Sequence, residues 1–236
     1  MFCAPPRLVP LCKSLCLKPA GQAIGVRSVV KSAIRQGFNA LDLAFTDEHI
    51  DQFTRYLSIL ARWNQAYNLT AIREPERMVT HHLLDSLAIL PFCQGERLMD
   101  LGSGAGLPGV PIAMMRPAWS VRLVDSNGKK TRFLDYVTRQ LDLTSVVVER
   151  SRGEDVSGRF DTITARAFGN LSQIAKICAP RLAENGRIVA MKSEIEDDET
   201  RAFVLSDTGL VITDTVTLSV PGVAGVRSVV LLSRSD

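Results

Sequence analysis

Three glycines at alternate positions, Gly102, Gly104 and Gly106, follow the apolar run that ends at Leu101. Glycines at this spacing let a backbone turn sharply and approach a ligand closely, because they have no Cβ. A dinucleotide fingerprint would place its third glycine one position later, where this chain has Leu107. No Lys-Ser or Lys-Thr pair follows the glycines, so a phosphate-binding P-loop is also excluded. Considered alone, the loop could also be a turn that binds no ligand.

Acidic groups follow the next two predicted strands. Asp125 ends the second strand, where a carboxylate can accept hydrogen bonds from both hydroxyls of a ribose; its alternative role is to begin a turn. Gly153 and Glu154 follow the third strand, where a backbone N–H and a carboxylate could bind the edge of an adenine. Together these groups place a nucleoside across the sheet without a pyrophosphate. An adenosyl sulfonium cofactor, S-adenosylmethionine, fits that arrangement.

The apolar pattern from Arg97 onward predicts the scaffold that positions these groups. Seven short apolar runs predict strands, and helical stretches separate the first five of them. This alternation predicts a parallel sheet with helices on both faces, and Pro221 with Gly222 predicts a hairpin between the last two strands. The predicted strands are Arg97–Leu101, Val121–Asp125, Ser145–Glu149, Phe160–Ala165, Gly186–Lys192, Leu210–Leu218 and Arg227–Ser233.

A small helical unit precedes the sheet. Thr46 is a predicted N-cap, and apolar residues at helical spacing follow it. A second helix is predicted to begin at Pro75 and to end at Pro91. Ordered structure is therefore expected to begin near Thr46. We expect a disordered basic extension over residues 1–45, a helical unit over 46–92 and a cofactor-binding methyltransferase domain over 93–236.

Composition limits the class of protein. Apolar residues make up 46% and charged residues 22% of the chain, as in ordinary globular proteins, and the net charge of +3 neither requires nor excludes a nucleic-acid partner. Five cysteines without Cys-x-x-Cys spacing predict no disulfide framework and no zinc site, so the reducing cytoplasm fits best. No apolar run approaches the ~20 residues that span a bilayer.

The first 41 residues hold six basic and no acidic residues, as in an organellar transit peptide. Four prolines in this stretch, at positions 5, 6, 10 and 19, interrupt any amphipathic helix. We therefore favour a disordered extension or a start codon upstream of the true N-terminus.

The chain resembles the glucose-inhibited-division B family, the bacterial small-subunit ribosomal RNA guanine-N7 methyltransferases (methyltransferase G). The resemblance covers roughly residues 46–232 and departs from the family at His81, where an arginine is common. The matching motifs, in chain order, are Trp63–Thr70, His82–Ser86, Asp100–Pro111, Leu123–Leu134 and Ala165–Ala167.

The resemblance implies a Rossmann-like, seven-stranded class I methyltransferase sheet with a small helical N-terminal unit. It implies cofactor contacts at Gly102, Leu107, Gly153, Glu154 and Arg166. The implied product is a 7-methylguanosine in small-subunit (16S) ribosomal RNA, and the implied partner is that RNA or the 30S particle. We expect a monomer that binds no membrane.

Guanine N7 carries a free lone pair and no proton. Its methylation needs in-line placement against the sulfonium carbon and no general base. The stretch Ala165–Gly169 lacks the Asn/Asp-Pro-Pro-aromatic clamp used for exocyclic amines. We therefore predict no catalytic acid or base and no metal ligand. Arg166 is expected to orient the guanine or the cofactor, with an ion pair at the rim as its alternative role.

Four basic residues lie near the predicted carboxyl edge of the sheet, where RNA must enter. They are Lys129, Lys130, Arg132 and Lys192. Such residues can bind RNA phosphates, although they are also ordinary on a solvated helix.

Other polar and aromatic residues are expected to be structural. His81 and His82 precede Asp85 by four and three residues on one predicted helix, so we expect a His–Asp pair rather than a metal site. Trp63 and Tyr67 are expected to pack together rather than to stack on bases.

Two other functions remain compatible with the sequence. A small-molecule methyltransferase would need a lid, for which the N-terminal helices are too short. The other is a non-catalytic nucleoside sensor, and the intact glycines, Asp125 and Arg166 argue against decay of the site. Transfer of labelled methyl groups to RNA, compared with free nucleosides, separates these functions.

Overall fold

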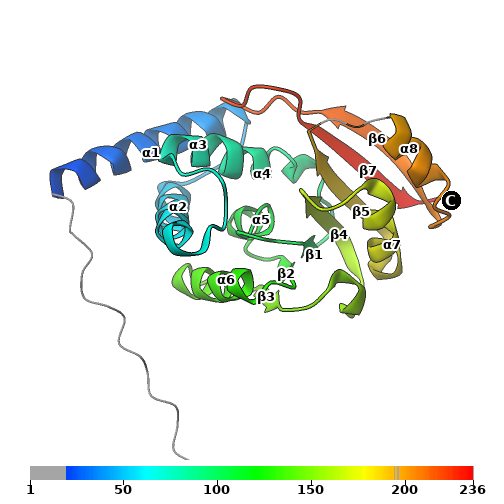
Figure 1. The fold of residues 1–236 in the computed structure, drawn as a ribbon. Coiled ribbons are helices and arrows are strands. Elements are labelled where there is room, and N and C mark those ends of the chain that lie inside the picture. Colours follow the sequence, from blue (N-terminus) through cyan, green and yellow to red (C-terminus); the bar gives the residue numbers. More distant parts are fainter. Residues whose placement is uncertain (1–19, 194, 196, 236) are drawn as a thin grey trace, which may run out of the picture.

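The computed structural model describes residues 20–193, 195 and 197–235. At its centre is a seven-stranded sheet in the order β3-β2-β1-β4-β5-β7-β6, which is the predicted fold class (Figure 1). Strands β1 to β5 pair in parallel, and β7 pairs antiparallel with β5 and β6. The strands are β1 (Arg97–Leu101), β2 (Ser120–Val124), β3 (Val146–Glu149), β4 (Phe160–Arg166), β5 (Leu182–Lys192), β6 (Leu210–Thr217) and β7 (Ser228–Arg234).

All seven predicted strands are confirmed, and β5 differs most from its predicted range because it begins at Leu182, four residues early. Helices cover both faces: α2, α5 and α6 on one side, α7 and α8 on the other (Figure 1). The helical segments of the sheet domain are α5 (Gly109–Met115), α6 (Gly128–Gln140), η3 (Gly153–Asp155), α7 (Leu171–Cys178), η4 (Ala179–Arg181) and α8 (Asp197–Val204).

Strand register aligns the residues that precede the predicted ligand groups. Leu101, the last residue of β1, pairs with Val124 of β2 and with Ala165 of β4. Because the chain crosses from β3 at one edge to β4 beside β1, helices leave β1 and β4 on opposite faces and open a crevice at their carboxyl ends. The residues that follow β1 and β2 meet at this crevice.

Helix α2 (Asp47–Tyr67) begins at the predicted N-cap. The Thr46 side chain accepts a hydrogen bond from the His49 amide (3.3 Å), and the His49 ring accepts one from the Thr46 amide (3.1 Å). A histidine thus completes a capping box that glutamate or glutamine usually completes. At its other end, Trp63 stacks on Tyr67 (ring centroids 5.1 Å apart) and packs against Phe133 and Tyr136 of α6, which confirms its packing role.

Ordered structure begins before Thr46, contrary to the sequence-based expectation. Helix α1 (Ala20–Ala40) buries Val30, Ile34 and Phe38, one helical turn apart, against the core of the N-terminal helices. Two of its three basic residues form ion pairs with α2, Lys31 with Asp51 and Arg35 with Asp47. The predicted disorder is therefore wrong for residues 20–45, while residues 1–19 lie outside the described residues.

The second predicted helix is divided into α3 (Pro75–Met78), a π-helical turn η1 (Val79–Leu84), α4 (Asp85–Leu87) and a 3-10 turn η2 (Leu90–Phe92). In the π turn the Asp85 amide donates to the Thr80 carbonyl, five residues back, and to the His82 carbonyl. Its apolar stripe is buried as expected, in a core continuous with α1, α2, α5 and α6. No helix in the described part of the chain is both long and apolar enough to cross a membrane.

Helix α1 should contribute to the stability of the whole fold. Phe38 is fully buried and makes edge contacts with Phe45 and Phe53. Phe38→Ala should lower the free energy of unfolding by about 3–5 kcal/mol, measured by urea denaturation. Val29→Ala, on the same helix but 49% exposed, should leave it nearly unchanged. Equal and small effects of the two substitutions would mean that α1 is detached from the core in solution.

Candidate active site

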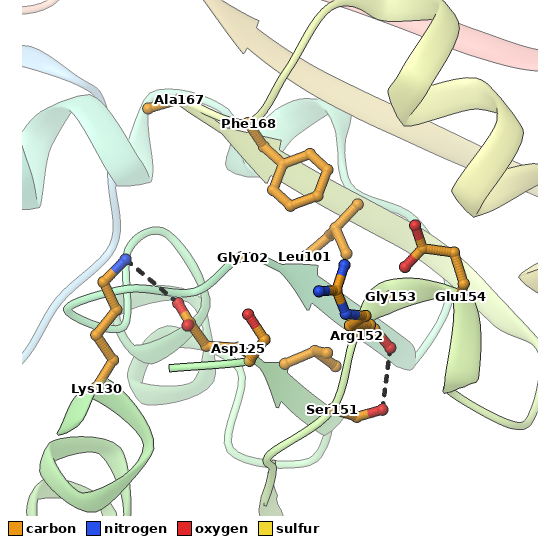
Figure 2. Close-up of a pocket in the computed structure, with 12 residues that line it drawn as sticks. Leu101, Gly102, Asp125, Lys130, Ser151, Arg152, Gly153, Glu154, Ala167 and Phe168 are labelled. Carbon is orange, nitrogen blue, oxygen red and sulfur yellow. Dashed lines mark hydrogen bonds and ion pairs between the residues drawn. The ribbon is translucent and has the colours of Figure 1, made fainter. Parts of the chain in front are cut away.

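A cleft of about 330 Å³ opens at the carboxyl ends of β1 and β2 (Figure 2). Four of the predicted cofactor residues line it: Gly102, Asp125, Gly153 and Glu154. Gly104, Gly106 and Leu107 are not among the described residues that line the cleft; they belong to the loop that shapes it. The other residues of its wall are Leu101, Val124, Ser126, Lys130, Ser151, Arg152, Ala167 and Phe168.

The loop after β1 needs its glycines for two different reasons. Gly102, Gly104 and Gly106 all have positive φ, of 70°, 58° and 87°. A Cβ at Gly102 would lie 2.6 Å from the Phe168 ring, and one at Gly106 would lie 2.5 Å from Val110. At Gly104 the nearest atom would be 3.7 Å away, so only the backbone conformation requires a glycine there. The glycines therefore let the loop fold tightly beside the cleft, and its backbone is open only at Gly104.

Asp125 joins this loop to the tip of β2. Its buried carboxylate accepts hydrogen bonds from the Gly104 amide (3.0 Å) and the Asn127 amide (2.8 Å). Lys130 lies 3.6 Å from the same group (Figure 2). The turn-forming role considered from the sequence is thus present. A carboxylate has about four lone-pair sites, so Asp125 retains acceptor capacity toward the cleft.

The turn after β3 packs closely on the sheet. A Cβ at Gly153 would lie 2.5 Å from Leu101 and 2.7 Å from Ile177. Arg181, which the sequence analysis missed, holds this turn by donating to the Glu154 carbonyl and the Val156 carbonyl (2.9 Å). It also donates to the Ile177 carbonyl of α7 (2.8 Å). The backbone of Gly153 and Glu154 is therefore held rigidly at the cleft.

Two buried side chains, Asp100 and Tyr56, hold the glycine loop and the start of α5 through hydrogen bonds. Asp100 accepts hydrogen bonds from the Gly109 amide (3.1 Å) and from the Thr164 hydroxyl (2.8 Å). Burial raises the pKa of Asp100 to about 6. Tyr56 of α2, fully buried, donates to the Ala105 carbonyl (2.8 Å). The helical unit thus contacts the loop directly.

Arg166 points away from this cleft into a second cavity of about 270 Å³, with Ala167 in the wall of both. It forms an ion pair with Asp85 (3.0 Å) and donates to the His81 carbonyl (2.7 Å). This is the alternative ion-pair role. Arg227, which the sequence analysis did not consider, pairs with the other oxygen of Asp85 (3.3 Å).

The expected His–Asp pair is wrong. His82 contacts the Thr70 hydroxyl through Nε2 (2.8 Å), and His81 contacts the Thr80 hydroxyl through Nδ1 (2.7 Å). The reason is the π turn, in which residues three and four apart no longer align as they do on an α-helix. Burial lowers the pKa of His82 to about 4, so this ring is neutral at pH 7.

The basic residues predicted to bind RNA are only partly brought together. Lys129 and Arg132 are exposed on α6, and Lys130 reaches the cleft. Lys192 lies apart in the second cavity, where it donates to the Gly169 carbonyl (2.8 Å) and pairs with Glu199 (2.6 Å). Its charge is therefore neutralised within the protein.

The sequence matches a family model described as rRNA small subunit methyltransferase G over residues 49–229. The chain belongs to this family. The ribosomal RNA small subunit methyltransferase G of Chromobacterium violaceum is 42% identical over 200 residues, which cover 84% of this chain and 94% of that protein. The protein of the same name from Stenotrophomonas maltophilia is 46% identical over 181 residues, which cover 76% and 84%.

Solved structures support the fold of the family member. The magnesium protoporphyrin IX methyltransferase of Synechocystis, solved with bound SAM, superposes with a TM-score of 0.55 at 16% identity and covers 81% of this chain and 99% of that one. A glycopeptide N-methyltransferase complexed with S-adenosyl-L-methionine also gives 0.55, at 9% identity, and covers 66% and 96%. At these identities the similarity establishes the methyltransferase fold alone.

If Asp125 binds ribose, its replacement should remove discrimination between sugars. Asp125→Ala should weaken binding of S-adenosylmethionine by about 1.5–3 kcal/mol, because charge-assisted hydrogen bonds are lost. Calorimetry should show that a 2′,3′-dideoxy analogue binds wild type and variant equally. A variant that still prefers the cofactor over the analogue would leave Asp125 only its contacts to the Gly104 and Asn127 amides.

Asp100 should make stability depend on pH. Its pKa is about 6 in the folded protein and 3.8 as the reference for an unfolded chain, so the folded state binds the proton more tightly. The stabilisation from this group is complete below pH 3.8 and is lost as the pH rises through about 6. Asp100→Asn should remove this decline in the free energy of unfolding, measured by urea denaturation across that range. Parallel pH profiles for the two proteins would contradict the assignment.

Proposed function

We propose that this protein transfers the methyl group of S-adenosylmethionine to N7 of a guanine in small-subunit (16S) ribosomal RNA. The observation that carries the proposal is its membership of the rRNA small subunit methyltransferase G family over residues 49–229, a range that includes every residue of the cleft. The cleft at the crossover of a methyltransferase sheet supplies the matching site.

The cleft residues fit an adenosyl sulfonium compound. Asp125 would accept the ribose hydroxyls, and the turn at Gly153 and Glu154 would bind the adenine. The open backbone at Gly104 would lie against the amino-acid part of the cofactor, because Lys130 and a backbone oxygen are the only described atoms within 4 Å of where its Cβ would lie. When bound, the cofactor supplies an electrophilic methyl group.

The acceptor requires placement rather than proton removal. Guanine N7 has a lone pair and no hydrogen, so no residue need act as a base. The second cavity, which shares the lining residue Ala167 with the cleft, would hold the acceptor guanine, with Arg166 in its wall. Under this proposal the protein acts as a monomer in the cytoplasm, on the RNA or on the 30S particle.

The exposed residues Lys129 and Arg132 would bind RNA phosphates beside the cleft, together with Lys130. Lys192 is left out of this surface because Glu199 neutralises it. A surface that binds phosphates releases counterions, so its affinity for RNA falls with added salt.

Methyl transfer from labelled S-adenosylmethionine tests the proposal. We expect label at guanine N7 in small-subunit RNA or 30S particles, with none in free nucleosides; the comparison of naked RNA with particles identifies the substrate form. Label only in free nucleosides would support a small-molecule enzyme. Cofactor binding without transfer to any acceptor would support a nucleoside sensor. Either result would overturn the proposed function.

The same assay, run across a salt series, tests the RNA surface. The double variant Lys129→Ala/Arg132→Ala should raise the Michaelis constant for RNA and flatten its salt dependence by up to about 1.4 log units per log unit of salt, at roughly 0.7 per single-strand contact. Arg55→Ala/Arg139→Ala removes the same charge near the far end of α6, where Arg55 of α2 contacts Gln140, and should change neither. Identical slopes for both double variants would place RNA elsewhere.

A further inference from the structure

Asp85 is a buried carboxylate shared by two arginines from different parts of the sheet domain. Its side chain is only 4% exposed, and its two oxygens lie 3.0 Å from Arg166 Nη2 and 3.3 Å from Arg227 Nε. Arg166 ends β4, and Arg227 precedes β7, two positions away in the sheet. A carboxylate this buried is costly unless it is paired, so each of the three groups restrains the others.

The π turn adds a second restraint on Arg166. Because the Asp85 amide donates to the carbonyls of Thr80 and His82, the His81 carbonyl is available to accept from Arg166 Nη2 (2.7 Å). That nitrogen therefore donates to the His81 carbonyl and lies 3.0 Å from the Asp85 carboxylate, while Nη1 lies 3.4 Å from the Ser86 hydroxyl. Single π turns of this kind occur frequently at functional sites.

These groups form a wall of the second cavity, next to the methyl-donor cleft. The two arginines and one aspartate leave a net charge of +1, since Lys192 in the same wall is already paired with Glu199. Met191 and Leu218 supply apolar surface. The cavity thus suits a flat, electron-rich base.

A guanine offers O6 and N7 as neighbouring acceptors, and an unrestrained arginine binds both with its two-pronged guanidinium. Such binding would occupy the lone pair that must attack the methyl group. An arginine whose Nη2 is already committed cannot use that fork, and it can hold O6 while N7 stays free.

We propose that Asp85 is a positioning residue that holds Arg166 and Arg227 in the second cavity, so that Arg166 binds the acceptor guanine without covering N7 and Arg227 adds positive charge beside it. This inference rests on the proposed function, because it assumes guanine as the acceptor. It assigns to the motif His82–Ser86 a role in the reaction through its aspartate.

Asp85→Asn tests this role because it keeps the shape of the side chain and frees the arginines. We expect kcat for RNA methylation to fall on the order of 10- to 100-fold, as for a misplaced acceptor. The Michaelis constant for RNA should not rise, and cofactor affinity should be unchanged. Unchanged kcat, or lost cofactor binding with unchanged RNA parameters, would overturn the inference.

Transcripts in which 7-deazaguanosine replaces guanosine lack N7, so the affinity of the protein for them measures whether an arginine contacts N7, independently of methyl transfer. Wild type should bind these RNAs and ordinary RNA equally, because the restrained Arg166 avoids N7. Asp85→Asn should bind the 7-deaza RNA more weakly, since the freed fork uses N7. Equal binding of both RNAs by the variant, or discrimination by wild type, would overturn the proposal.

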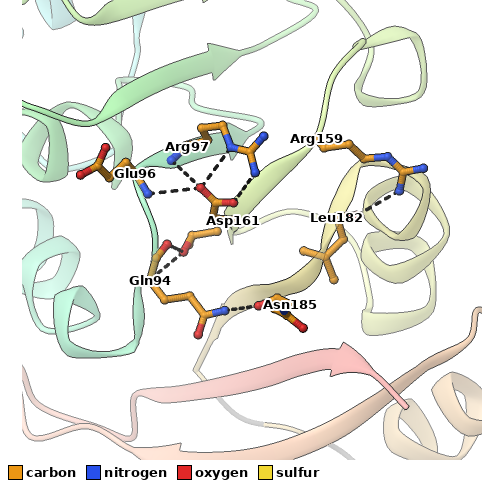
Figure 3. Close-up of polar contacts among 8 residues, drawn as sticks. Gln94, Glu96, Arg97, Arg159, Asp161, Leu182 and Asn185 are labelled. Atoms are coloured by element: carbon orange, nitrogen blue, oxygen red, sulfur yellow. Dashed lines mark hydrogen bonds and ion pairs between the residues drawn. The ribbon is translucent and has the colours of Figure 1, made fainter. Parts of the chain in front are cut away.

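Asp161→Asn is the matched control, because Asp161 lies near the start of β4, at the opposite ends of the parallel strands from the two cavities. Asp161 pairs with Arg97 (2.6 Å) and accepts from the amides of Glu96 (3.2 Å) and Arg97 (3.0 Å) (Figure 3). Its replacement breaks an ion pair without touching either cavity, so stability should fall while kcat and RNA discrimination stay at wild-type values. The same loss of kcat in both variants at equal folded fraction would reduce Asp85 to a structural residue.

Should Asp85→Asn fail to fold, Arg227→Gln replaces it. Arg227 is 28% exposed and lies outside the strand, and Asp85 keeps Arg166 as a partner. The Michaelis constant for RNA should rise with unchanged cofactor affinity, and unchanged RNA parameters would overturn the inference. Inactivity of wild type on small-subunit RNA would instead refute the proposed function, so the two failures are distinguishable.

Discussion

Leu101 pairs with Val124 on one side and with Ala165 on the other, and the geometry of the site depends on that alignment. Parallel strands in register end at one level, so Gly102 and Asp125, which follow β1 and β2, lie at the same level as Arg166, the last residue of β4. The crossover from β3 to β4 then sends the connections to opposite faces. A shift of one residue in β4 would turn Arg166 to the other face, because side chains alternate along a strand.

Three buried aspartates surround this edge, and each is satisfied by a different kind of partner. Asp125 is bound by backbone amides and remains at a solvent-accessible cleft. Asp100 lies deepest, with an amide and a hydroxyl but no cation in contact among the described residues, and burial raises its pKa. Asp85 has two guanidinium groups. The partner decides whether a buried carboxylate serves as an acceptor for ligands, as an internal brace or as an anchor for cations.

Much of this architecture follows from local sequence. The seven strands are short apolar runs between turn residues. In the glycine loop, the backbone conformation or the close neighbours of each position require a glycine there, so the sequence itself marks the loop. Asp125, Gly153 and Glu154 could be predicted because each directly follows a strand. The N-cap at Thr46 is likewise a local signal.

What could not be predicted depends on contacts between distant segments. The basic, acid-free sequence of α1 indicates an extension, yet its acidic partners Asp47 and Asp51 lie on α2. The π turn replaces the expected His–Asp pair by contacts to Thr70 and Arg166, which are 12 and 85 residues away from His82 and His81. Glu199 neutralises Lys192, and Arg181 holds the turn at Glu154 from a separate helix. Contacts of this kind leave no helical or strand periodicity in the sequence from which they could be predicted.

The hydrogen bond from Tyr56 to the Ala105 carbonyl has a consequence for cooperativity. A helix that contributes a buried donor to a ligand loop cannot open without leaving that carbonyl unsatisfied, at a cost of about 1–3 kcal/mol. Local opening of α2 and loosening of the loop are therefore one event in the native ensemble, and their amide protons should exchange with solvent together. A ligand that orders the loop would also slow amide exchange in α2. Binding in the cleft would thus stabilise a part of the chain that does not contact the ligand.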